Sequence, residues 1–156
     1  MELYRRHGPA LVRKARRLLA NADDAQDVVQ ALFLDLIASG VVERDLPYLY
    51  RAVTHRCLSM LRDTKNRARL LEREQDGLRG AVRTRCDDEA IGLDLLSKVL
   101  GALDARASEV LVYRYFDDLS QEEIAQLLGI SRKTVGKALQ DVREAVQRVR
   151  QSGETS

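Results

Sequence analysis

The chain has 156 residues, of which 45% are hydrophobic and 32% charged, and its formal net charge is +2. This length allows one domain or two small ones. No apolar run approaches the roughly 18 residues of a membrane span, and the first residues lack a signal-peptide pattern, so we expect a cytoplasmic protein. Two prolines and few alternating β-branched residues argue against a sheet and favour an all-α fold.

Side chains that commonly carry catalysis or hold metals are scarce. The chain has two histidines, no glycine-rich phosphate loop and no nucleophile–base pair, which argues against an enzyme. Cys57 and Cys86 are far apart and no C-x-x-C occurs, so no metal or other cofactor is expected. Cys57 falls on an apolar helix stripe and is expected to be a buried structural thiol.

The first helix is expected at residues 2–20, with Lys14 among the basic residues around it. The segment "NADDAQD" ends this helix and begins a second, with Asp24 as the expected N-cap. Asp24, Asp27 and Gln30 form an acidic edge beside the core face of the second helix. That core face is expected to contain Val28, Val29, Leu32, Phe33, Leu36 and Ile37.

A loop at residues 39–45 leads to a third helix with Pro47 in its first turn. The exposed face of this helix is expected to carry aromatic, basic and small polar residues, namely Tyr48, Tyr50, Arg51, Thr54, His55, Ser59 and Arg62. Aromatic rings mixed with arginine suit single-stranded nucleic acid, because bases stack on rings and phosphates pair with cations. For this segment alone, a solvated helix face with two partly buried tyrosines is the simpler interpretation.

Helical periodicity fades after Arg73 and resumes at Ile91, which predicts two helical domains joined by a linker. We place the domains at residues 1–72 and 91–152 and the linker at residues 73–90. In the second domain, Asp104 is expected to cap a helix that buries Val110 and Leu111.

The segment "LSQEEIAQLLGISRKTVGKALQDVREAV" predicts a helix-turn-helix. Ser120 and Glu123 form a capping box, Gly129 suits a left-handed turn, and Ser131 is a good N-cap for the second helix. The exposed face of that second helix shows Arg132, Lys133, Lys137 and Gln140, which can reach phosphates and base edges in the major groove of DNA. The alternative is a plain helical hairpin with a solvated basic face.

Charge is divided unevenly along the chain. Residues 1–70 carry 13 Lys and Arg against 8 Asp and Glu, whereas residues 100–156 carry 8 against 9. A DNA-binding module without net positive charge binds weakly alone, because phosphate neutralisation supplies most non-specific affinity. Either a partner holds the helix-turn-helix on DNA, or a second DNA-contacting surface lies in the first half.

The motifs "DDAQDVVQALFLDL", "LPYLYRAVTHRCLSMLR" and "YRYFDDLSQEEIAQLLGISRKTV" occur in that order, with a charged linker before the last of them. In order and spacing the chain resembles the extracytoplasmic-function group of bacterial sigma factors, over nearly its whole length. The resemblance implies a region 2-like domain, a region 4-like domain and no catalysis. It also implies a promoter-specificity subunit that binds core RNA polymerase (the β′ clamp helices and the β flap) and promoter DNA, controlled by an anti-sigma factor.

The resemblance assigns roles to matching positions. The β′ clamp helices would contact Asp24, Asp27 and Gln30, with Phe33 more core than contact. The loop at residues 39–45 and the third helix would recognise and melt the −10 element through Tyr48, Arg51, His55, Ser59 and Arg62. The recognition helix would bind the −35 element through Arg132, Lys133, Thr134, Lys137 and Gln140.

This sequence departs from the family pattern at several of these places. The family usually has Trp, Asn and Asp where this chain has Tyr48, His55 and Ser59. In the recognition helix, Gly136 occupies a common Lys position, and Ala138 and Asp141 occupy common Arg positions. These departures imply unusual promoter contacts.

Two other functions remain open at this point. One is a sigma-like decoy that sequesters an anti-sigma factor without supporting transcription, and such a decoy needs no outward group of Tyr48, Tyr50, Arg51 and Arg62. The other is a stand-alone helix-turn-helix repressor, which predicts high-affinity duplex binding by the purified protein. The negative charge of the C-terminal part disfavours the repressor.

Overall fold

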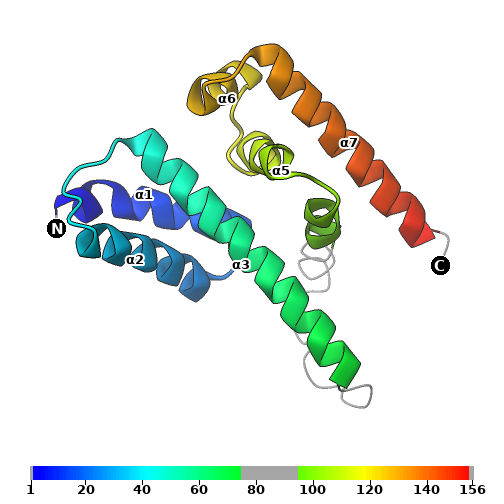
Figure 1. Ribbon diagram of the computed structural model, residues 1–156, viewed down its shortest axis with the longest axis horizontal. Coiled ribbons are helices and arrows are strands. Elements are labelled where there is room, and N and C mark those ends of the chain that lie inside the picture. Colours follow the sequence, from blue (N-terminus) through cyan, green and yellow to red (C-terminus); the bar gives the residue numbers. More distant parts are fainter. Residues whose placement is uncertain (1, 75–94, 155–156) are drawn as a thin grey trace.

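The structure, a computed structural model, describes residues 2–74 and 95–154, and the regular elements in those ranges are all helices. In chain order they are α1 (Glu2–Leu19), α2 (Ala22–Ala38), α3 (Leu46–Glu74), a helix at residues 95–101, α5 (Ala105–Leu111), the π-helix η1 (Val112–Phe116), α6 (Gln121–Leu128) and α7 (Arg132–Glu154). The all-α prediction is confirmed (Figure 1).

Helices α1 and α2 pack side by side because the chain reverses within two residues. Ala20 takes a left-handed φ of 54° that ends α1, and the Asn21 side chain accepts the backbone N–H groups of Asp23 and Asp24 at 2.9 and 3.0 Å. Asn21 is therefore the N-cap, and the prediction of Asp24 is wrong. The Asp24 carboxylate instead lies in the first turn, where negative charge complements the helix dipole.

The core face of α2 is buried as expected from Val28 to Leu36, but Ile37 is 55% exposed, so its predicted burial is wrong. Phe33 is buried and meets the Tyr4 ring edge to face at 5.1 Å, which confirms its place in the core. On α3, Leu49, Val53 and Cys57 are buried, and the Cys57 thiol is free, as predicted. Burial raises the pKa of this thiol to about 12.

The C-terminal part forms the predicted helix-turn-helix from α6 and α7. Ser120 and Glu123 form both halves of the capping box, and Gly129 takes a left-handed φ of 66° after α6. The Ser131 hydroxyl accepts the N–H of Thr134 at 3.1 Å and thereby caps α7. Asp104 caps α5 through the N–H of Ala107, and α5 buries Val110 and Leu111, also as predicted.

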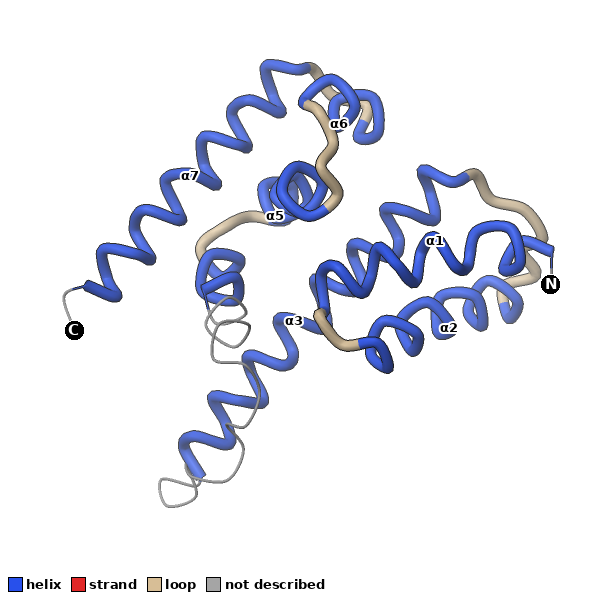
Figure 2. The backbone as a smooth tube through the Cα atoms, turned by 180° about the vertical axis from the view of Figure 1, so that it is seen from behind, coloured by secondary structure: helices blue, strands red, loops and turns tan. Residues whose placement is uncertain are grey.

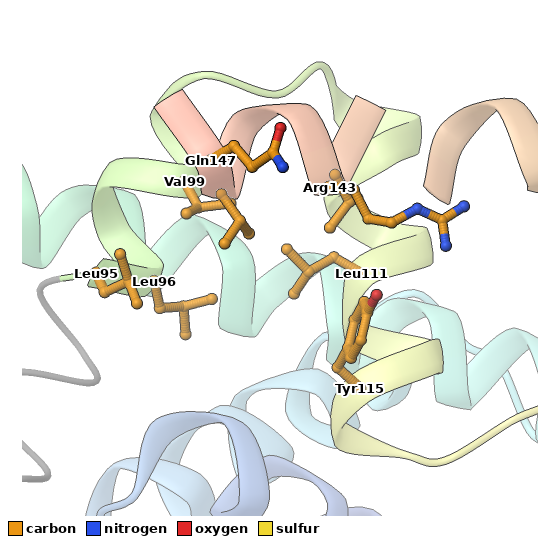
Figure 3. Close-up of a pocket in the computed structure, with 9 residues that line it drawn as sticks. Leu95, Leu96, Val99, Leu111, Tyr115, Arg143 and Gln147 are labelled. Carbon is orange, nitrogen blue, oxygen red and sulfur yellow. The ribbon is translucent and has the colours of Figure 1, made fainter. Parts of the chain in front are cut away.

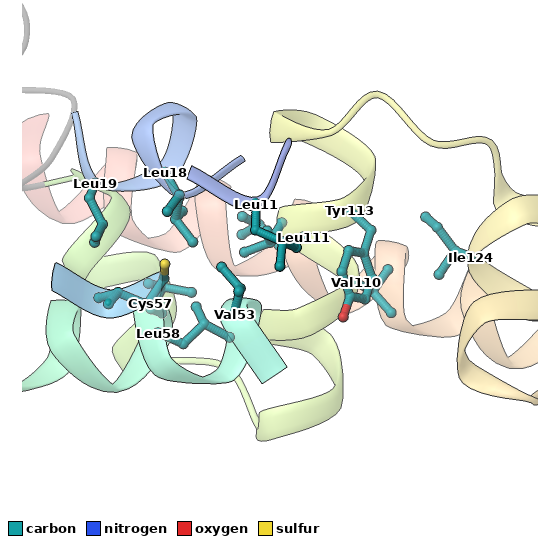
Figure 4. Close-up of a cluster of buried hydrophobic side chains, with 14 of the residues drawn as sticks. Leu11, Leu18, Leu19, Val53, Cys57, Leu58, Val110, Leu111, Tyr113 and Ile124 are labelled. Carbon is teal, nitrogen blue, oxygen red and sulfur yellow. The ribbon is translucent and has the colours of Figure 1, made fainter. Parts of the chain in front are cut away.

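The two halves are packed together over a shared hydrophobic core. Helix α5 contacts α3 on one side and α7 on the other, and both views place it between them (Figures 1 and 2). Figure 4 follows this core from Leu11 and Val53 in the first half through Val110 and Leu111 to Ile124. Loss of these contacts would return much apolar area to water, which stabilises the packed arrangement.

Most of the predicted linker, and Cys86 with it, lies outside the described residues. Its first two positions, residues 73–74, belong to α3, which continues past the expected domain end at residue 72. The expected loop at residues 39–45 is confirmed between α2 and α3, and Pro47 lies in the first turn of α3.

Candidate nucleic-acid interface

Helix α7 presents a basic, solvent-exposed edge at its N-terminus. Arg132, Lys133 and Lys137 are all exposed, and none of them is needed to cap the helix. Gln140 is exposed one turn further on and donates a hydrogen bond to Glu144 at 3.3 Å. Contact between Gln140 and a base edge requires the side chain to exchange this weak surface bond for one to DNA.

Other residues of the same helix face inward or are already engaged. Thr134 is half-buried, and its hydroxyl lies 2.8 Å from that of Ser131. Ala138 is buried, so an arginine at this position would point into the core rather than at DNA. Asp141 is half-buried and lines a pocket of about 360 Å³ together with Lys133 and Lys137, where its charge partly offsets theirs.

The candidate −10 face of α3 is divided between solvent and the other half of the protein. Tyr48 is 46% exposed and Arg44 lies over its ring at 4.9 Å from the centroid. Ser59 and Arg62 are exposed, and Arg62 reaches the Ser108 hydroxyl of α5 at 3.4 Å. The open end of this face, around Tyr48, is free for a stacked base.

Arg51 and His55 are both paired with Glu109, a residue of α5. Arg51 donates to one carboxylate oxygen of Glu109 at 2.8 Å, and Nε2 of His55 lies 3.2 Å from the other. The Glu109 side chain is only 7% exposed, and it also accepts the hydroxyl of Tyr113 at 2.7 Å. Tyr50 stacks on Tyr113 with ring centroids 5.9 Å apart, so the prediction that Tyr50 belongs to the exposed face is wrong.

A second buried carboxylate lies just beyond η1. The Asp117 side chain is 1% exposed and holds Lys14 at 2.5 Å and Arg17 at 2.8 Å, both from α1. Lys14 is itself buried and lies over the Tyr50 ring at 4.0 Å, so its predicted place among exposed basic residues is wrong. We define the interdomain cluster as Lys14, Arg17, Tyr50, Arg51, His55, Glu109, Tyr113 and Asp117.

Burial and pairing oppose one another in this cluster. For Lys14, burial prevails over the attraction of Asp117 and lowers the pKa. For Glu109, burial alone would raise the pKa, but hydrogen bonds from Arg51, Tyr113 and His55 outweigh burial and lower it. Burial, with the adjacent Asp117 carboxylate, raises the pKa of Tyr50. Glu109 is therefore an ionised acceptor at neutral pH.

The sequence carries a signal for this cluster that was not among the predicted sites. Glu109, Tyr113 and Asp117 recur every four residues, so they share one face of a helix. Lys14 lies three residues after Leu11 and four before Leu18, which places it on the buried stripe of α1. A charged residue on such a stripe predicts a buried partner, although nothing in the sequence says which carboxylate supplies it.

The candidate polymerase-binding residues lie on the outer face of α2. Asp24, Asp27 and Gln30 are all exposed. Beside Gln30 the same helix exposes Leu34 (64%) and Ile37 (55%), and these line an apolar pocket of about 310 Å³ with Tyr4 of α1. Exposed aliphatic side chains next to a pocket mark a surface for a protein partner, and only the polar part of this surface was predicted from the sequence.

A pocket of about 510 Å³ between α2 and α3 brings two of the predicted sets together. Asp27, from the candidate polymerase set, lines it with His55 and Ser59, from the candidate −10 set. The two predicted surfaces are therefore neighbours, so a protein bound on α2 and a nucleic acid bound on α3 would lie against each other.

A larger apolar pocket, of about 430 Å³, lies on the other half between the helix at residues 95–101, α5 and α7. Leu95, Leu96, Val99 and Leu111 form its wall, and Tyr115 and Arg143 flank its opening (Figure 3). Tyr115 is 57% exposed there. An apolar groove with a polar rim suits the apolar face of a partner helix.

The part of the chain that the structure describes holds no group of three or more His, Cys, Asp or Glu placed to bind a metal. Among the helices of residues 2–74 and 95–154, none is long and apolar enough to span a membrane.

The fold and these surfaces define a class: an all-helical protein with a helix-turn-helix and a second basic, aromatic helix face. The family description "Sigma-70 region 2" matches residues 3–67, and "Sigma-70, region 4" matches residues 93–146. The chain is 30% identical over 141 residues to the RNA polymerase sigma-E factor of Streptomyces avermitilis, covering 88% of this chain and 77% of that protein. It is 31% identical over 139 residues to the protein of the same name from Streptomyces coelicolor, covering 88% and 78%.

Among solved structures, the chain is similar in fold to CnrH in complex with the cytosolic domain of CnrY. The match has a TM-score of 0.52 at 24% sequence identity and covers 97% of this chain and 86% of that chain. The chain belongs to the sigma-70 family of RNA polymerase sigma factors, in its extracytoplasmic-function group. Members of this family are regulatory subunits of RNA polymerase.

Proposed function

We propose that this protein binds core RNA polymerase in the cytoplasm and directs it to promoters, with no catalytic activity of its own. The observation that carries the proposal is the capped helix-turn-helix with Arg132, Lys133 and Lys137 exposed, in a chain that also matches region 2. A helix-turn-helix without net positive charge needs a partner to hold it on DNA, and core polymerase is such a partner.

The −35 element would be read by α7. Arg132, Lys133 and Lys137 supply phosphate contacts and acceptor-directed bonds at the N-terminus of the helix, and Gln140 supplies a base contact. Thr134 has a smaller role, because its hydroxyl is already bonded to Ser131. With Gly136 and Asp141 in place of cations, we expect weaker −35 binding than a fully basic helix would give.

The −10 element would be captured at the start of α3 and the loop before it. Extruding a base costs a few kcal/mol, so melting requires a stacking surface and cations at one place. Tyr48 with Arg44 over its ring provides the surface, and Arg51, His55, Ser59 and Arg62 follow along the same face. Two members of this face, Arg51 and His55, are held by Glu109 in the packed arrangement.

The partner surfaces lie away from the DNA-reading residues of α7. The β′ clamp helices of core polymerase would dock on α2 at Asp24, Asp27 and Gln30, with Leu34 and Ile37 extending the contact. The apolar groove of Figure 3 would receive the β flap, or a helix of an anti-sigma factor when the protein is held inactive. We place the two domains at residues 1–74 and 91–152, with the linker between them.

Run-off transcription with purified bacterial core polymerase, with and without the protein, tests this function. Discrete transcripts that require the protein support it, and their start sites locate both promoter elements. Binding to core or to an anti-sigma factor without any transcript would instead support the decoy. The outward group expected to separate these functions does not do so, because Tyr50 and Arg51 are partly covered by α5 and η1. High-affinity binding to duplex DNA without polymerase would support a repressor.

A further inference from the structure

The same residues that would hold the −10 element hold the two halves of the protein together. Arg51 and His55 are bound to Glu109, and Arg62 reaches Ser108, so three of the five candidate −10 residues contact α5. A second pair of cations, Lys14 and Arg17 of α1, is bound to Asp117. A nucleic acid strand and Glu109 cannot occupy the guanidinium of Arg51 at the same time.

Geometry makes the packed arrangement incompatible with promoter binding as a whole. The −10 and −35 elements are separated by about 25 base pairs, which is about 85 Å along the duplex at 3.4 Å a step. A compact chain of this length has a radius of gyration of only about 15 Å. The two halves, which share one core here, must separate before α3 and α7 can reach their elements together.

Resting on the proposed function, we propose that the interdomain cluster is an autoinhibitory latch: Glu109 and Asp117 hold the −10 face against α5 and η1 until a partner separates the halves. The carboxylates suit this role because both are buried while several of their cations remain half-exposed. The side chains of Arg51, His55 and Arg17 are 39%, 53% and 46% exposed, so they return to solvent readily when the halves part.

Opening is nevertheless costly enough to keep the free protein closed. Separation would expose the stacked rings of Tyr50 and Tyr113 and the apolar residues between α3 and α5. It would also leave Asp117 and Lys14 to regain water in place of each other, which is the favourable part of the exchange because both charges are desolvated in the closed state. A protein partner that binds both halves in the open state shifts this balance.

Asp117→Asn, compared with Asp118→Asn, tests the latch on the full chain. Asp117 is buried between Lys14 and Arg17, whereas the neighbouring Asp118 side chain is 96% exposed and pairs with Arg114 in its own segment. Small-angle X-ray scattering reports the radius of gyration, and a fluorescent 15-nucleotide single strand of mixed sequence reports access to the −10 face. For Asp117→Asn we expect a larger radius and binding about tenfold tighter, because apparent affinity scales with the open fraction.

Three results give the outcome its meaning. Asp118→Asn should match the wild-type protein in both measurements, and adding Arg51→Ala to Asp117→Asn should remove the gain in binding. An unchanged radius for a folded Asp117→Asn protein overturns the latch. A larger radius without tighter strand binding overturns the autoinhibitory role, since the −10 face would then have been accessible in the closed protein.

Glu109→Gln is the second variant, needed if Asp117→Asn leaves Lys14 buried without a charge partner and does not fold. It removes a charge that faces half-exposed cations, so no buried cation is stranded, and the amide oxygen still accepts the Tyr113 hydroxyl. We expect the same opening and about tenfold tighter strand binding; no change would overturn the latch. Because scattering needs no polymerase, a failed run-off experiment would overturn the proposed function and leave the latch testable.

Discussion

Gly136 occupies the middle of the first exposed turns of α7, at a place where a side chain would meet nothing within 4 Å. Its backbone is helical, so Gly136→Ala adds helix propensity without a clash, and we expect stabilisation of about 1 kcal/mol. Urea unfolding followed by circular dichroism measures the change.

Gly129 is the matched control for this substitution. It also has nothing within 4 Å, but its φ of 66° is one that alanine adopts only with strain. Gly129→Ala should destabilise the protein by about 1 kcal/mol or more. Equal effects of the two substitutions would mean that the turn between α6 and α7 does not need its left-handed residue.

His55 shows how a departure from the family pattern gained a local reason. Where the family usually has Asn, this chain has an imidazole whose Nε2 lies 3.2 Å from Glu109. From the sequence alone, His55 could be placed on the outer face of its helix, and it does lie there, 53% exposed. Its partner could not be predicted, because Glu109 lies in the other half of the chain, across an interface that no periodicity encodes.

At the scale of elements, α2 carries the clearest test of partner binding. Leu34 is 64% exposed beside Gln30, and a leucine of this kind contributes to affinity when a partner buries it. We expect Leu34→Gln to weaken binding to core polymerase by about tenfold, or about 1.4 kcal/mol, with no change in folding. Fluorescence anisotropy with labelled protein and purified core measures the affinity.

Val42→Gln is the control for Leu34→Gln. Val42 is 81% exposed on the loop at residues 39–45, which the proposal assigns to DNA rather than to core. The control should leave the affinity for core unchanged in the absence of DNA. Equal losses from the two substitutions would remove α2 from the docking surface.

The elements themselves were largely predictable because local chemistry marks their ends. The capping box at Ser120, the left-handed Gly129, the cap at Asp104 and the start of α3 near Pro47 all act within a few residues. The N-cap of α2 was misplaced because Asn21 and Asp24 both suit a cap, and only the geometry after Ala20 selects between them. The π-helix η1 has no comparable sequence signal, since its wider turn is set by the partners that Tyr113 and Asp117 meet.

For the whole molecule, acid should loosen the closed arrangement through Glu109. Burial raises the pKa of this carboxyl, but hydrogen bonds from Arg51, Tyr113 and His55 outweigh burial and bring it below the ordinary 4.5. The unfolded chain therefore takes up the proton first. The stabilisation is complete above about pH 4.5 and is lost as pH falls through the lower pKa of the folded protein.

Comparison of the wild-type protein with Glu109→Gln isolates this carboxyl from the others that titrate in acid. The free energy of unfolding in urea, measured from about pH 3 to pH 6, should differ most between the two proteins at the upper end. The difference should shrink towards the lower end. A difference that stays constant across this range would show that the ionised form of Glu109 contributes nothing to stability.

The arrangement of the two halves was the part that the sequence could not predict. Each half has its own periodic helices and caps, so each could be recognised by itself, but their common core joins surfaces far apart in the chain. Leu11 and Val110 both read as ordinary buried positions, and neither indicates that the other is nearby.

The double engagement of Arg51 has a consequence for mutagenesis of the DNA-contacting face. Replacing Arg51 with alanine removes a cation from the nucleic-acid complex, but it also removes one of the bonds that Glu109 makes to α3. The two losses have opposite signs in a binding assay, so they partly cancel, and alanine scanning of the free protein will understate what Arg51 does. The loss should appear at full size only in a background that is already open, such as Asp117→Asn.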